Sequence, residues 1–169
     1  MPTKHFAKTP FTLATALLVC LCAAQNLHAQ GHCTSIGGTV MTNLGAVDNF
    51  TTLGVAHGGL EGAVAATIIS VVPGPRDTIL FTVQHHFVTQ DGDNILVDPA
   101  TATTKLVAPG LYAILDYPVQ IKGGTGKFAG AKGEFNNIGA VELNSDGVTG
   151  KTVFRYSGHV CFAMPESHD

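Results

Sequence analysis

The sequence predicts an all-β protein, folded as an antiparallel sandwich or an up-and-down barrel. Only 12% of the 169 residues are charged, about half the usual share, and 20 are glycine, which is typical of short strands and tight turns. Beyond the N-terminal segment, no window of a dozen residues has helical apolar spacing without an interrupting glycine or proline. Apolar and polar residues alternate instead, as in antiparallel sheets with one face in water.

The N-terminal segment has the layout of a secretory signal peptide. Two lysines among the first eight residues precede an apolar run at residues 11–24, and Ala29 follows a short polar stretch. The run is shorter than the roughly 20 residues that a membrane-spanning helix needs. We therefore predict that residues 1–29 are a cleaved signal peptide and that residues 30–169 form a single domain. The protein should be secreted or periplasmic, with no membrane span.

The charge balance of the remaining chain bears on its partners. Cleavage after Ala29 leaves 140 residues, with seven basic and twelve acidic side chains and hence a net charge of −5. Nucleic-acid-binding surfaces are basic, so we expect no nucleic-acid partner.

Two cysteines, Cys33 and Cys161, remain near the two ends of the cleaved chain. An oxidising compartment favours a disulfide between them. The bond requires that the two Cα atoms lie within about 7 Å. The first and last strands should therefore be neighbours, and the alternative is a pair of free buried thiols.

The strand patterns can be followed in chain order. Residues 60–72 end in a run of β-branched residues, and residues 77–90 alternate most clearly. Asp91-Gly92 is typical of a tight hairpin turn, and residues 94–98 begin the return strand. Further segments with strand patterns, the last two separated by a turn at Asp146-Gly147, are residues 111–121, 134–143 and 148–162.

Alternation also assigns side chains to the faces of these strands, because successive residues point to opposite sides. Three apolar faces are predicted to point inward. They are Ile79, Phe81, Val83, His85 and Phe87; Leu111, Ala113, Leu115, Tyr117, Val119 and Ile121; and Phe154, Tyr156, Gly158, Val160 and Phe162.

The glycine-rich segment GGTGKFAGAKG, residues 123–133, superficially matches a dinucleotide-binding fingerprint. That fingerprint requires a helix directly after it, and here the chain returns to alternation. A phosphate-binding loop requires Ser or Thr after its lysine, but Phe128 follows Lys127. We predict a tight turn in which Phe128 is an apolar plug.

The same segment resembles a known family. GGTGKF, followed by a small residue and Gly130, is similar to the turn-and-strand signature of the allene oxide cyclase and dirigent-like β-barrel superfamily, which includes uncharacterised secreted bacterial members. The resemblance is strongest over residues 119–162 and extends loosely over residues 43–98, through the HHF step at residues 85–87. It implies an eight-stranded antiparallel β-barrel with a mostly apolar central cavity, often assembled into homo-oligomers.

Family activities are not carried over with the fold. Plant cyclases of this superfamily isomerise a fatty-acid epoxide, and dirigent proteins steer the coupling of phenoxy radicals. Their catalytic acids and arginine have no matching positions in this chain.

The histidines and acidic residues do not predict a metal or cofactor site. His85 and His86 are adjacent on a strand and therefore point to opposite faces. Turn chemistry explains Asp91 and Asp93 without a bound calcium ion. We expect no metal and no cofactor. Asn49 begins a glycosylation sequon, which has meaning only in a eukaryotic source.

Four polar side chains fall on the predicted inner faces of the barrel: His85, Tyr117, Asn137 and Tyr156. Small barrels can enclose one ligand, so these four are the predicted ligand-binding residues. A solid core is the alternative. The first functional hypothesis is a secreted, non-enzymatic barrel that binds a small apolar or phenolic ligand. The others are an isomerase or cyclase acting on a reactive lipid, and a structural or interaction module.

Overall fold

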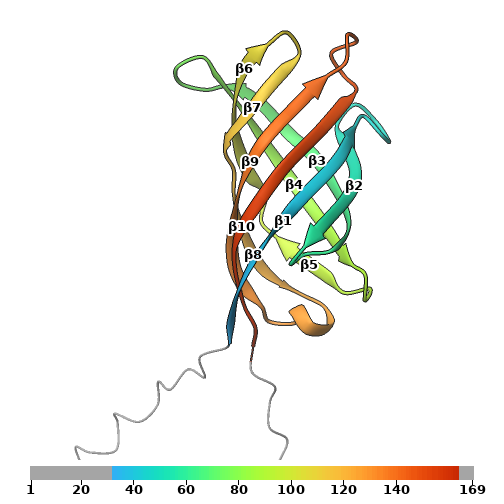
Figure 1. Ribbon diagram of the computed structural model, residues 1–169, viewed down its shortest axis with the longest axis vertical. Coiled ribbons are helices and arrows are strands. Elements are labelled where there is room, and N and C mark those ends of the chain that lie inside the picture. The colour runs from blue at the N-terminus through green and yellow to red at the C-terminus, as the bar shows by residue number, and fades with distance from the viewer. Residues whose placement is uncertain (1–31, 164–169) are drawn as a thin grey trace, which may run out of the picture. The chain divides into compact units, whose positions relative to one another are not determined.

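The computed structural model describes residues 32–163, which form β-structure almost throughout (Figure 1). The predicted signal peptide lies outside these residues. A single 3-10 turn, η1 (Gly126–Phe128), interrupts the strands. The strands are β1 (Cys33–Leu44), β2 (Thr51–Gly58), β3 (Gly62–Pro73), β4 (Thr78–Thr89), β5 (Asn94–Val97), β6 (Ala100–Ala108), β7 (Leu111–Asp116), β8 (Pro118–Gly124), β9 (Lys132–Leu143) and β10 (Gly150–Cys161).

The strands close into one antiparallel barrel. β1 to β4 pair in sequence, and β10 pairs with both β9 and β1. β5 and β6 both pair with β4, so together they occupy one strand position. β7 and β8 both pair with β9 and share another position in the same way. The predicted eight-stranded antiparallel barrel is therefore confirmed.

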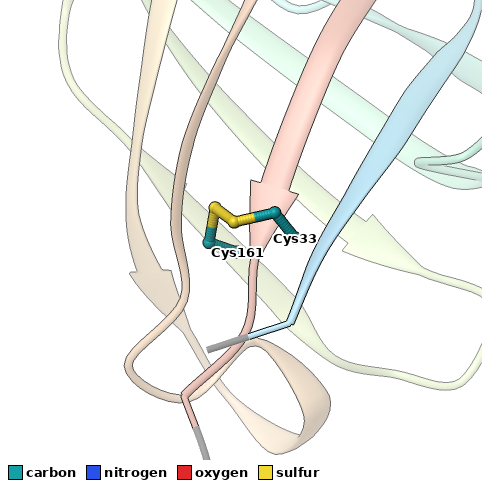
Figure 2. Close-up of a disulfide and its surroundings, with 2 residues drawn as sticks. All are labelled: Cys33 and Cys161. Atoms are coloured by element: carbon teal, nitrogen blue, oxygen red, sulfur yellow. A yellow bond between two sulfur atoms is a disulfide. The ribbon is translucent and has the colours of Figure 1, made fainter. Parts of the chain in front are cut away.

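The barrel closes where the first and last strands meet. β1 and β10 pair over their whole length, from Cys33 opposite Cys161 to Leu44 opposite Gly150. The predicted disulfide joins Cys33 to Cys161 at one end of this seam, across 128 residues of sequence (Figure 2). Both the disulfide and the predicted contact between the first and last strands are confirmed.

The end of the barrel that holds the disulfide is filled with side chains. Phe87, Phe135 and Tyr156 pack edge-to-face in its interior, and Phe128 of η1 is buried against Phe162. The predicted plug at Phe128 is thus confirmed.

Tyr156 also joins this filled end to the turn between β2 and β3. Its hydroxyl accepts a hydrogen bond from the Leu60 backbone N–H at 2.8 Å and donates one to the His57 carbonyl at 3.0 Å. Gly38 leaves room for this side chain, since a Cβ there would overlap the Tyr156 ring and the His57 carbonyl.

The inward face predicted for residues 111–121 is wrong over the first half of that segment. Residues 111–121 are two strands, and a register shift near the end of β7 leaves Leu115 as one extra residue between the partners of Thr103 and Thr104. The shift reverses the alternation, because a β-bulge moves every following side chain to the other face. Leu115 is therefore 51% exposed, whereas Tyr117 is buried as predicted. Tyr112 and Ile114 point inward instead of Leu111 and Ala113.

Candidate ligand cavity

The half of the barrel opposite the disulfide encloses a cavity of about 480 Å³. Its walls are mostly apolar and include Ala66, Ile68, Phe81, Ala102 and Ile114. Among the lining residues there is no Asp, Glu, Lys or Arg. Apolar ligands favour such a site, because burial there removes apolar surface from water without leaving a charge unpaired.

The mouth of the cavity lies between turns that connect the strands. Asn49 and Phe50 line it from the β1–β2 turn, and Gly147 and Val148 line it from the β9–β10 turn. Figure 1 shows these turns at the end of the barrel away from η1 and from the start of β1, where Cys33 forms the disulfide. The cavity therefore has an opening at one end and a packed floor at the other.

The floor of the cavity is an aromatic cluster of His85, Tyr117 and Phe154. The His85 ring centroid lies 5.5 Å from that of Tyr117 and 6.2 Å from that of Phe154. The Tyr117 hydroxyl and His85 Nδ1 are hydrogen-bonded at 3.0 Å. The next inward residues on the same strands, Phe87 and Tyr156, are buried below this layer and do not line the cavity.

Burial determines the charge of this pair. It lowers the pKa of His85 to about 4, with a smaller contribution from neighbouring His86, so the imidazole is neutral at pH 7. Burial also raises the pKa of Tyr117 above its ordinary value, so the phenol keeps its proton. The floor of the cavity is thus polar but uncharged.

Two asparagines on β9 hold Tyr117 in place at the break between β7 and β8. Asn136 Oδ1 accepts hydrogen bonds from the backbone N–H groups of Tyr117 and Asn137, both at 2.8 Å, and its Nδ2 donates to Asp116. Asn137 Nδ2 donates to the Tyr117 carbonyl at 2.7 Å. The Asn137 backbone N–H also donates to the Tyr117 carbonyl at 3.1 Å, so backbone and side-chain bonds together fix the turn that directs Tyr117 inward.

The four predicted ligand-binding residues separate into two groups. His85 and Tyr117 come together on the floor of the cavity, as the strand pattern placed them. Asn137 and Tyr156 are buried but do not line the cavity. The Asn137 side chain donates a hydrogen bond to the Tyr117 carbonyl, and the Tyr156 hydroxyl is hydrogen-bonded to the β2–β3 turn.

Sequence reasoning missed three threonines of the cavity wall, Thr52, Thr104 and Thr152. Thr152 could have been found, since it shares the alternation of Phe154 and Tyr156 on the last predicted strand. Thr52 lies on β2 and Thr104 on β6, where no strands were predicted, so no signal pointed to them.

The acidic turn after β4 is held by protein groups. Lys127 Nζ pairs with Asp91 at 2.9 Å, and the Lys127 backbone N–H donates to Asp93 at 3.2 Å. Within residues 32–163, no group of three or more His, Cys, Asp and Glu side chains is arranged to hold a metal ion.

No helix in this part of the chain is long and apolar enough to cross a membrane.

No family model and no curated protein matches the chain. The solved structures that are similar include those of the pterocarpan synthase dirigent proteins GePTS1 and PsPTS1, at 14% and 13% sequence identity with TM-scores of 0.32 and 0.33. Each similarity covers 80% of this chain, and 93% and 99% of the respective dirigent chains. The strand pairing described above, and not these similarities, establishes the barrel.

Proposed function

We propose that the barrel binds one small, predominantly apolar molecule in its cavity. The observation that carries the proposal is the cavity itself, with apolar walls, an opening at one end and no charged lining residue. Its volume of about 480 Å³ lies in the range of small-molecule sites, roughly 300–1,000 Å³. Side chains from all the strands that line the cavity would surround a ligand bound there.

The chemistry of the floor favours binding over isomerisation. An isomerase that abstracts a proton from a reactive lipid would need a base strong enough to take it at neutral pH. With a pKa of about 4, His85 is a weak base, and no carboxylate lines the cavity to assist it. The pair is better suited to orienting a ligand through hydrogen bonds.

Filling the cavity should weaken ligand binding. Ala66 lines the cavity on β3, directly opposite His85 in the strand register. In the Ala66→Phe variant the new ring would occupy the space above the floor. We expect the affinity for the neutral fluorescent dye N-phenyl-1-naphthylamine to fall at least about tenfold, a change of about 1.4 kcal/mol, in a fluorescence titration.

The matched control makes the same substitution on the outside of the same strand. Ala63 is exposed on β3, so Ala63→Phe adds the same ring without entering the cavity. This variant should bind the dye as the unchanged protein does. Equal dye binding by the Ala66→Phe variant would contradict a binding site inside the barrel.

The outer surface favours self-association as a second role. Val153, Met41 and Val55 lie side by side in register on β10, β1 and β2, and each is between 43% and 47% exposed. Contiguous exposed apolar side chains often mark interaction surfaces. We therefore propose that the protein forms homo-oligomers through this row of side chains. In that case the barrel would also act as an interaction module.

A charge in the middle of this row should weaken self-association. We expect Met41→Lys to shift the sedimentation velocity profile towards a smaller species than that of the unchanged protein. Ser157→Lys, at an exposed position further along β10, is the control and should leave the profile as it was. A monomer in all three samples would rule out the oligomer at the concentrations tested.

We also propose that the protein is secreted or periplasmic after removal of residues 1–29. The Cys33–Cys161 disulfide supports this location, since such bonds persist in oxidising compartments. The intact mass of the exported chain would test the cleavage position after Ala29.

A further inference from the structure

We propose that the ligand is a neutral molecule with a hydroxyl group, which bonds to the His85–Tyr117 pair while the apolar remainder fills the cavity. This inference rests on the proposed function, since it assigns the chemical class of the ligand. It follows from three observations: the hydrogen-bonding groups that the pair leaves open, the position of the pair on the floor, and the absence of charge among the lining residues.

The pair has hydrogen-bonding capacity left after its own bond is made. His85 Nδ1 and the Tyr117 hydroxyl bond to each other at 3.0 Å. Within residues 32–163, no other protein group bonds to His85 Nε2 or to that hydroxyl. Because both residues line the cavity, these remaining groups are available to a ligand rather than enclosed in the core.

The open groups always comprise a donor and an acceptor. A phenol and a neutral imidazole each have one hydrogen to donate and at least one lone pair. If the Tyr117 hydroxyl donates to Nδ1, then Nε2–H of His85 is a free donor and the phenol oxygen a free acceptor. If Nδ1–H donates instead, the phenol O–H is the free donor and Nε2 the free acceptor. A ligand hydroxyl both donates and accepts, and so fits either tautomer.

Other ligand classes fit the floor less well. An ether or ketone can only accept, and it would leave the acceptor of the pair without a partner. A carboxylate has no hydrogen to donate and would carry its charge into a cavity without Lys or Arg. An ammonium group would lie equally unpaired, because no Asp or Glu lines the cavity.

Three probes with ten carbon atoms separate these classes. 1-Decanol presents a hydroxyl, its isomer nonyl methyl ether presents only an acceptor, and decanoate carries a charge. In isothermal titration calorimetry at pH 7, decanol should bind about threefold to tenfold more tightly than the ether. Decanoate should bind at least about a hundredfold more weakly than decanol, because its charge would be buried without a partner.

Variants assign the preference to the floor. His85→Phe combined with Tyr117→Phe replaces both bonded groups by apolar rings of similar shape, which avoids leaving one polar partner unpaired. In this double variant, decanol and the ether should bind with the same affinity. Tyr117→Phe alone should lower the ratio of the two affinities, and gives a second test if the double variant does not fold. His86→Phe, a control on the exposed face of β4, should keep the preference.

The outcomes distinguish this inference from the proposed function. If the unchanged protein binds none of the probes, both fail. If decanol and the ether bind equally, or if decanoate binds as tightly as decanol, the hydroxyl assignment fails while the apolar site stands. If the preference for decanol persists in the double variant, the hydroxyl lies elsewhere, for example at Thr52 or Thr152 on the wall, and the assignment to His85 and Tyr117 is overturned.

Discussion

Replacing both Cys33 and Cys161 by serine should lower the free energy of unfolding by about 4 kcal/mol. The disulfide spans 128 residues of sequence, so it restricts nearly all of the described chain in the unfolded state. The chain-entropy model gives about 4.7 kcal/mol for a loop of about 100 residues, and measured values tend to be somewhat smaller. Urea denaturation of the double serine variant and of the oxidised protein measures the difference directly.

The unchanged protein in the presence of a reductant is the control for this experiment. Its midpoint should move to that of the serine variant, since both lack the covalent link. The dependence of the unfolding free energy on urea concentration should be steeper without the disulfide, because a freer unfolded chain exposes more surface. A difference below about 1 kcal/mol would mean that β1 and β10 remain associated in the unfolded state.

Acid should destabilise the protein by about 3 kcal/mol through His85 alone. The pKa of a histidine is about 6.5 in an unfolded chain, and burial lowers that of His85 to about 4. Between these values the unfolded state binds a proton that the folded state does not, so stability falls as the pH falls. The contribution is complete above pH 6.5 and is lost by about pH 4, at about 1.4 kcal/mol for each pH unit of difference.

The double variant His85→Phe and Tyr117→Phe isolates this effect. Its free energy of unfolding should vary less between pH 6.5 and pH 4 than that of the unchanged protein, by about 3 kcal/mol. Backbone and side-chain hydrogen bonds hold the pKa values of Asp48 and Asp146 below their usual range, so those carboxyls act mainly below this window. Parallel pH profiles for the two proteins would show that folding does not lower the pKa of His85.

Much of the barrel could be predicted from the sequence, because long strands with one face in water show clear alternation. The last predicted strand is an example, since Phe154, Tyr156 and Val160 are all buried as expected. β1, β2 and β6 were not individually predicted. Their small, threonine-rich and glycine-containing sequences, such as ATATTKLVA in β6, have weak apolar contrast between the two faces.

The site was predictable only where the alternation is uninterrupted. His85 lies on a regular strand and was placed correctly, whereas the faces of Leu111, Ala113 and Leu115 were reversed by the bulge before Tyr117. Here the side-chain oxygen of Asn136, on the neighbouring strand β9, accepts a hydrogen bond from the Tyr117 backbone N–H, and no local sequence pattern reveals this contact. Knowing which residues point inward also does not show which of them line a cavity. Asn137 is as inward as Tyr117, yet it packs beneath the floor.

The closing seam has a practical consequence for work with this protein. The described chain begins and ends side by side, with the Phe162 N–H bonded to the His32 carbonyl at 3.0 Å, at the end of the barrel away from the cavity mouth (Figure 1). A tag, a fusion partner or a solid support joined near either end would therefore stand behind the barrel. Immobilised in this way, the protein would present its opening to the solution, and captured molecules could enter and leave unobstructed.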